Sequence, residues 1–141
     1  MIFTEIGEDE IGLAWRLLSE RPFEANISHQ EMPTRAEHAA YVRSHPYRAW
    51  LVIWVRDVAV GTIAVTKQNE IAIAILKEHQ RKGYAKEAIK EVLELFSPLH
   101  EIPGVRPAHF VANVAPGNLP SHALFTGLGA KLVSMTYRFG G

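Results

Sequence analysis

The chain has 141 residues, of which 48% are hydrophobic and 21% charged, and this predicts one compact domain covering residues 1–141. Its 15 basic and 15 acidic side chains give zero net charge, so no overall field would attract nucleic acid or an anionic membrane. Because the chain has no cysteine, disulfides, thiolate metal ligands and a covalent cysteine intermediate are excluded.

The N-terminal half predicts strands and helices separated by polar turns. In chain order these are a strand at Ile2–Ile6, a helix at Asp9–Glu20, a loop at 21–33, a helix from Thr34 to Ser44, and a hairpin of Ala49–Val55 and Val58–Thr66 turning at Arg56-Asp57. The second helix has a recognisable start. Thr34-Arg35-Ala36-Glu37 fits a capping box, in which the first and last side chains each accept a backbone N–H of the other.

The C-terminal half begins with a strand at Glu70–Leu76, whose continuous apolar run is typical of a strand covered on both faces. From Ala85 to Phe96 the apolar spacing changes to three and four residues, which predicts an amphipathic helix. The remaining predicted elements are a loop at Pro98–Pro107, a strand at Ala108–Val114, a helix at Leu119–Leu128 and a last strand at Lys131–Phe139.

No targeting or metal-binding segment stands out. The N-terminal residues MIFTEIGEDE lack a basic region followed by an apolar run, and the longest apolar stretch is far too short to cross a bilayer. A cytoplasmic location is therefore predicted. The seven histidines are scattered without metal-ligand spacing, so no metal site is expected.

The loop between the central strand and the following helix carries the strongest functional signal. It contains Gln80, Arg81, Lys82, Gly83, Tyr84 and Ala85. A glycine turn that enters a helix presents backbone N–H groups without intrahelical acceptors, and these groups favour a phosphate-sized anion. Three alternatives stay open. The glycine could mark a plain strand-to-helix turn. Lys82, Lys86 and Lys90 could form a solvated helix face, or they could contact nucleic acid, which the neutral charge disfavours.

The strand, the QRKGYA loop and the helix resemble the segment with which the GNAT superfamily of acyl-CoA-dependent N-acyltransferases holds acetyl-CoA. Asn118 to Ala130 resembles a second motif of that family, N-x-x-(A/S)-x-x-L-(Y/F)-x-x-L-G-F, and both motifs with their flanks cover about Trp50 to Val133. The resemblance implies a mixed α/β fold, in which helices flank a central sheet with a splayed strand pair. It also implies acetyl-CoA as the acyl donor.

The same resemblance implies which residues contact the donor. The loop residues 80–85 would bind the pyrophosphate, and the amides of Ile73 and Ile75 would pair with the pantetheine arm, with Ile75 near the thioester carbonyl. Asn118, Ser121 and Phe125 would complete the cofactor site, although Asn118 could instead hold its own loop by local hydrogen bonds. Many relatives have a tyrosine at the position of Phe125, so the usual general acid is absent here.

Catalysis and acceptor binding are predicted less directly. An attacking amine must lose its proton, and the resemblance implies Glu70 as the base, directly or through water, with Asn113 beside the acceptor. Glu70 could equally be a solvent-facing carboxylate at a strand end. His29, Gln30 and Glu31 give a polar loop over the predicted acceptor cleft, which suits a sugar-like amine, although loops are polar in general.

These expectations predict an N-acetyltransferase acting on the primary amine of a small molecule, with an amino sugar as one candidate. Two alternatives remain: an acyl-CoA-binding module without turnover, and an enzyme that acetylates a protein N-terminus or lysine. A homodimer is left open.

Overall fold

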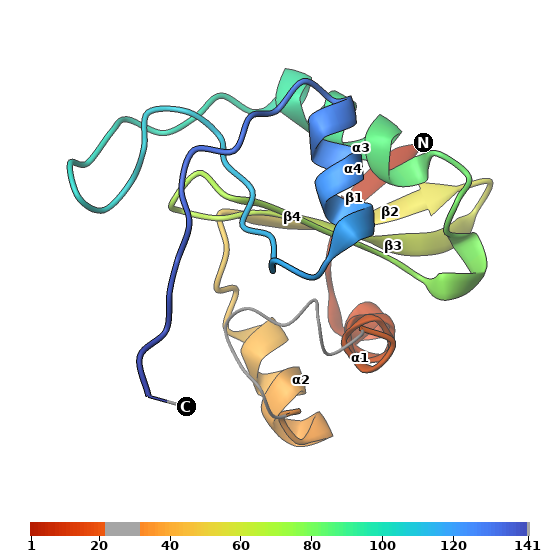
Figure 1. Ribbon diagram of the computed structural model, residues 1–141. Coiled ribbons are helices and arrows are strands. Elements are labelled where there is room, and N and C mark those ends of the chain that lie inside the picture. Colours follow the sequence, from red (N-terminus) through yellow and green to blue (C-terminus); the bar gives the residue numbers. More distant parts are fainter. Residues whose placement is uncertain (22–31, 141) are drawn as a thin grey trace.

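The computed structural model describes residues 1–21 and 32–140, and its centre is an antiparallel sheet (Figure 1). The sheet has the order β1-β2-β3-β4, so each strand pairs with its neighbour in the chain. The strands are β1 (Ile2–Glu5), β2 (Ala49–Val55), β3 (Val58–Val65) and β4 (Ile71–Ile75). The predicted hairpin is confirmed, and its turn uses left-handed backbone at Arg56 and Asp57.

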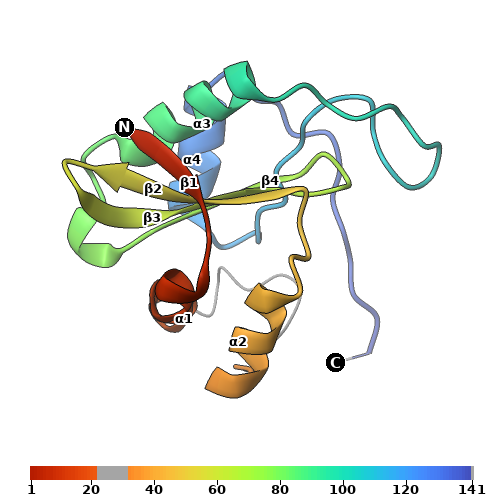
Figure 2. The same ribbon diagram turned by 180° about the vertical axis from the view of Figure 1, so that it is seen from behind.

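Helices cover both faces of this sheet (Figures 1 and 2). One face carries α1 (Ile11–Ser19) and α2 (Arg35–Arg43), and the other carries α3 (Tyr84–Leu95) and α4 (Leu119–Gly127). Short 3-10 turns precede α1 at Glu8–Glu10 and follow β4 at Lys77–His79. The predicted mixed α/β architecture is confirmed, as is the capping box at Thr34, whose hydroxyl accepts the Glu37 N–H at 3.1 Å.

One apolar cluster lies on each face of the sheet. The larger cluster joins Ile53, Ile63 and Val65 of the sheet to Ile89 and Val92 of α3. The smaller cluster lies on the other face. It consists of Ile6, Ala14, Val42 and Val52. Because side chains alternate along a strand, a sheet with both faces covered needs the nearly continuous apolar runs found in β2 and β3.

Gly61 allows β3 and β4 to approach closely. A Cβ at this position would lie 2.1 Å from the carbonyl oxygen of Ala74, which no side chain could tolerate. The β2–β3 register also shifts opposite Val60, as in a β-bulge. Gly61 therefore helps to fix the end of β4, from which the loop predicted to bind an anion begins.

Two predicted strands are not formed in this structure. Residues 108–114 make a single parallel bridge, between Val111 and Glu70, instead of a full strand. Residues 131–139 form no strand and are exposed along their length. Both corrections have the same cause, because a strand is stabilised only when a neighbouring edge accepts its backbone hydrogen bonds, and no described segment pairs with either along its length.

Candidate functional site

The edge of β4 opposite β3 is open over its second half. Ile71 donates its N–H to Val111 at 2.8 Å, whereas the Leu76 N–H reaches Val60 of β3, so odd and even residues of β4 face opposite edges. The backbone groups of Ile73 and Ile75 therefore point away from β3. Beyond Val111 no described backbone group bonds to them across this edge, which leaves room for an extended ligand.

Asn69 fixes the neighbouring chain at the point where the two segments part. Its side chain is fully buried, donates to the carbonyls of Leu99 (2.9 Å) and Pro107 (2.8 Å), and accepts the Leu99 N–H (2.8 Å). Its own carbonyl accepts the Val111 N–H at 2.9 Å. Sequence reasoning missed Asn69, because its partners are 30 or more residues away; asparagine at a turn was the only available signal.

The loop after β4 is held in a strained and specific shape. The Gln80 amide donates to the Ile75 carbonyl at 2.9 Å, which ties the loop back to the strand. Arg81 has a φ of 64° and Gly83 a φ of 81°, so two of three consecutive residues are left-handed. Left-handed backbone at a non-glycine residue costs free energy and is concentrated at ligand-binding turns.

The first turn of α3 offers unpaired N–H donors. Its first backbone bond runs from the Glu87 N–H to the Gly83 carbonyl, and no side chain caps the helix. Among the described residues, no backbone carbonyl accepts the N–H groups of residues 81–86. The exposed charges of Arg81, Lys82 and Lys86 surround these donors. A row of free amides at the positive end of a helix dipole is suited to a phosphate or pyrophosphate group.

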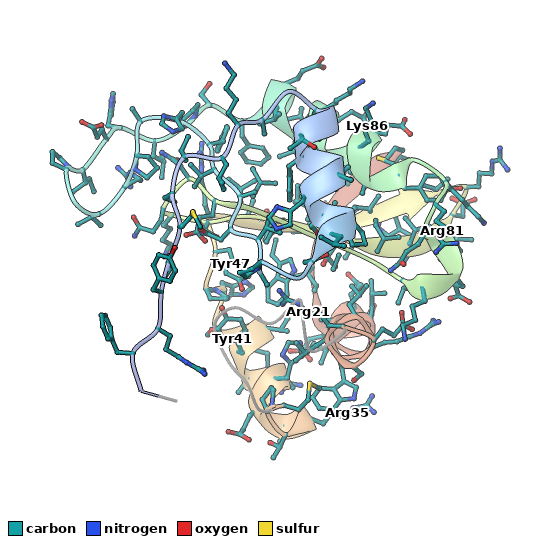
Figure 3. The ribbon with its side chains drawn as sticks, in the orientation of Figure 1. Arg21, Arg35, Tyr41, Tyr47, Arg81 and Lys86 are labelled. Carbon is teal, nitrogen blue, oxygen red and sulfur yellow. The ribbon has the colours of Figure 1, made fainter. Side chains whose placement is uncertain are left out.

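A cavity of about 220 Å³ lies where the open edge meets this helix start. It is lined by Ile75, His79, Gln80, Arg81, Gly83, Tyr84, Ala85, Lys86 and Leu124. In Figure 3, Arg81 and Lys86 lie on the side of the molecule where the loop enters α3. His79, Lys86 and Leu124 were not among the predicted site residues; Lys86 could have been found as a cation one turn after Gly83.

The start of α4 is closed by its own residues. The Asn118 side chain accepts the Ser121 N–H at 3.3 Å, and His122 bonds the Ala115 carbonyl at 3.1 Å. Phe125 packs against the larger apolar cluster. The local hydrogen bond that the sequence left open for Asn118 is thus present, and the predicted contacts of Asn118, Ser121 and Phe125 with a cofactor stay predictions.

Glu70, Tyr41 and Tyr47 lie toward the other face of the sheet, which α1 and α2 cover. Because Ile71, Ile73 and Ile75 pack with α3, the even residues face α1 and α2, and there Ala72 is exposed. Tyr41 donates its hydroxyl to Tyr47 at 2.8 Å (Figure 3). Burial chiefly raises the pKa of Tyr47 above its usual range, and the charge of Glu70 adds to the effect.

Several predicted residues are not brought into one site. His29, Gln30 and Glu31 lie outside the described residues. Asn113 is exposed, and no described group hydrogen-bonds its side chain. Within 1–21 and 32–140, no cluster of three or more His, Asp or Glu side chains is arranged to hold a metal, and no helix has the length and hydropathy of a membrane span.

Comparison with known proteins gives one family. A family model described as an acetyltransferase (GNAT) domain matches residues 5–131. No curated protein matches the chain.

Several solved structures share the fold at low identity. An acetyltransferase from Thermus thermophilus is 18% identical (TM-score 0.67; 94% of this chain and 87% of that chain covered). An aminoglycoside antibiotic 6'-N-acetyltransferase from Acinetobacter haemolyticus is 17% identical (TM-score 0.67; 100% and 98%). A putative acetyltransferase from Salmonella typhimurium, solved with acetyl-CoA, is 15% identical (TM-score 0.65; 100% and 87%).

Proposed function

Because the chain belongs to the GNAT acetyltransferase family, we propose that it is an acetyl-CoA-dependent N-acetyltransferase acting on the primary amine of a small molecule. Amino sugars are the first acceptors to test. One observation carries the proposal: the open edge of β4 runs directly into a helix start with free amides and three exposed cations. That surface offers hydrogen bonds for an extended arm and charge for a pyrophosphate.

The residues present fit acetyl-CoA in two places. The outward-facing amides of Ile73 and Ile75 would hold the pantetheine arm as an added strand, as peptides are held at open sheet edges. The N–H groups of residues 81–86 and the charges of Arg81 and Lys86 would hold the pyrophosphate. When bound, acetyl-CoA supplies a thioester as the activated acyl group.

The chain's own groups would then assist the transfer. The Ile75 N–H points out of the open edge, and a donor there stabilises negative charge that develops on a carbonyl oxygen. At pH 7, deprotonating an ordinary alkyl ammonium costs about 4.6 kcal/mol. Glu70 precedes Ile75 by five residues, about 16 Å along an extended strand. This is too far for one bridging water, so Glu70 is proposed to take the amine proton through a chain of several waters.

The acceptor is proposed to bind on the α1 and α2 side of β4. Ala72 leaves that part of the sheet exposed beside Glu70. The Tyr47 hydroxyl, whose raised pKa keeps it protonated, remains able to donate a hydrogen bond there. Polar residues His29, Gln30 and Glu31 are retained as candidate acceptor contacts on sequence grounds alone.

Thiol release from acetyl-CoA, measured with a panel of amines, tests the activity. The panel contains amino sugars, polyamines, free amino acids, and peptides with a free N-terminus or a lysine. We expect a small amine to support turnover, and Glu70→Gln to lower kcat by at least tenfold with little change in the KM for acetyl-CoA. Unchanged turnover of Glu70→Gln across the pH range would remove Glu70 from the mechanism.

One observation favours a second candidate, an acyl-CoA-binding module without turnover. Position 125 holds a phenylalanine packed against the apolar cluster, so no hydroxyl is available there to protonate a departing thiolate. This candidate predicts binding of coenzyme A by calorimetry with no thiol release for any amine in the panel. Turnover of peptides alone would instead identify a protein N-terminus or lysine as the acceptor.

A further inference from the structure

Helix α1 is hydrogen-bonded to the turn that follows β4, although the bonded residues are 57 or more positions apart in the sequence. The Glu20 carboxylate, at the C-terminal end of α1, accepts the backbone N–H of Lys77 at 2.8 Å. Arg16, one turn earlier, donates to Glu20 at 3.0 Å and to Glu78 at 2.8 Å. These four residues, called here the α1 network, join α1 to the 3-10 turn at Lys77–His79.

The α1 network ends beside the cavity at the start of α3. The Oε1 atom of Glu78 lies 3.8 Å from Nε2 of His79, and His79 lines the cavity of about 220 Å³. The next residue, Gln80, also lines the cavity and bonds the Ile75 carbonyl at 2.9 Å. The start of the loop 80–85 is therefore held by α1 on one side and by β4 on the other.

The strained part of this loop depends on such contacts. Arg81 and Gly83 have φ values of 64° and 81°, and strained backbone persists only where the surrounding structure determines it. No described residue outside the loop and α3 hydrogen-bonds to residues 81–83. The position of these residues is thus set from the two ends, by α3 and by the turn that the α1 network holds.

The charges of the α1 network are unfavourable for anion binding. Two carboxylates, Glu20 and Glu78, belong to the network, and Arg16 offsets only one of the two charges. The hydrogen bond from Lys77 chiefly lowers the pKa of Glu20, so this carboxylate is charged at neutral pH. Negative charge close to a bound phosphate weakens its binding. Charge alone therefore gives no reason for a carboxylate at position 20, whereas the bond to the Lys77 N–H does.

We propose that Glu20 is a positioning residue for the coenzyme A site. By holding the Lys77 N–H, its carboxylate fixes the turn from which the loop 80–85 starts, so that the N–H groups of residues 81–86 are already aligned when the pyrophosphate binds. Donors that are aligned in advance bind more tightly, because binding then carries little cost of ordering the loop. Glu20 acts through the turn and needs no contact with the coenzyme. This inference rests on the proposed function, because it concerns binding of the same acyl donor.

An ion pair elsewhere in the chain provides a matched control. Glu8 accepts two hydrogen bonds from Arg43, at 2.8 and 3.1 Å, and joins the turn before α1 to α2. Neither residue bonds to the turn 77–79 or lines the cavity. Exposed ion pairs of this kind contribute little to stability. Removing the Glu8 carboxylate thus changes the charge of the chain as removing the Glu20 carboxylate does, without touching the loop.

Calorimetry with coenzyme A and three variants tests the proposal. Glu20→Ala removes both a negative charge and the acceptor of the Lys77 N–H, Glu20→Gln removes the charge but keeps a side-chain oxygen, and Glu8→Ala is the control. Charge alone predicts that Glu20→Ala binds coenzyme A more tightly than the wild type. We expect the opposite, about fivefold weaker binding, because a hydrogen bond to a charged acceptor is lost. Glu20→Gln and Glu8→Ala should bind at least as tightly as the wild type.

The same variants give a kinetic and a structural readout. With acetyl-CoA and an active amine, Glu20→Ala should raise the KM for acetyl-CoA and leave kcat and the KM for the amine unchanged. In the ligand-free protein, the NMR amide resonances of residues 80–86 should shift in Glu20→Ala but not in Glu20→Gln or Glu8→Ala.

The outcomes separate this inference from the proposed function. If the wild type binds coenzyme A and Glu20→Ala binds it equally or more tightly, the positioning role is wrong and the proposed function stands. Equal losses of affinity in Glu20→Ala and Glu8→Ala would also overturn the positioning role, because the effect would then be general. A wild type that does not bind coenzyme A would overturn the proposed function, and the NMR comparison would then decide whether Glu20 orders the loop.

Discussion

Helices α3 and α4 lie on the same face of the sheet, but their first turns differ. At α4, the Asn118 side chain accepts the Ser121 N–H, and Pro120 in the first turn has no N–H to offer. At α3, the preceding residue is Gly83, which has no side chain, and the N–H groups of residues 81–86 have no described backbone acceptor. One helix start is closed by its own chain, whereas the other is open to a ligand.

The difference shows that the residue before a helix can decide whether the N-terminal end of the helix is available to bind an anion. An asparagine oxygen satisfies an N–H group that would otherwise bind an anion, and it stabilises the helix in doing so. A left-handed glycine turns the chain into the helix and leaves every donor free. The first turn of α3 thus offers free donors to an anion, whereas the first turn of α4 is capped by its own chain.

Substitution of Gly83 should have the largest effect on the open helix start. Its φ of 81° is unfavourable for any L side chain, and valine is especially disfavoured because of its branched Cβ. The loop is expected to shift out of the left-handed region and to misalign the N–H groups of residues 81–86. We expect Gly83→Val to weaken coenzyme A binding at least tenfold in calorimetry.

Gly104 offers a matched control. It has a φ of 75°, and like Gly83 it has no atom within 4 Å of the position that a Cβ would take, but it lies in the loop before residues 108–114. Gly104→Val should therefore carry a similar conformational cost without reducing coenzyme A affinity. Equal losses of affinity in both variants would mean that the effect comes from general destabilisation and not from the helix start.

The sequence predicted the open helix start well because its geometry is local. A glycine, a basic turn and a change of apolar period specify a strand, a loop and a helix within about fifteen residues. The capping box at Thr34 was found for the same reason. The roles of residues 80–85 in binding remain predictions, although their backbone geometry supports these roles, as does the cavity that all of them except Lys82 line.

The pairing of segments that are far apart in the sequence could not be predicted in the same way. The alternation in residues 131–139 predicts a strand but does not identify the edge with which it would pair, and no backbone group of the described residues pairs with it. The position of residues 108–111 depends on Asn69, whose hydrogen bonds reach Leu99 and Pro107. Asn118 was ambiguous because an N-cap and a ligand contact use the same side-chain oxygen.

Removing one cation from the open helix start should have a smaller effect than changing its backbone. Lys86 lines the cavity in the first turn of α3, whereas Lys90 is one turn further on and does not line it. Lys86→Gln should weaken coenzyme A binding about three- to tenfold, less at high salt because exposed charges are screened. Lys90→Gln should bind as the wild type does. Equal losses of affinity in the two variants would indicate that the effect comes from the overall charge of the helix and not from the cavity.

The closed helix start should give the smallest effect on binding and a measurable effect on stability. Loss of an N-cap side chain costs about 1 kcal/mol of unfolding free energy, so Asn118→Ala should lower Tm by about as much as Thr34→Ala does at the cap of α2. Asn118→Asp retains the capping oxygen and adds a negative charge. If α4 serves only as structure, Asn118→Asp keeps both stability and coenzyme A affinity. A fivefold loss of affinity in this variant, without loss of stability, would indicate that Asn118 lies next to the bound anion. The first turn of α4 would then contribute to binding, as the first turn of α3 is proposed to do.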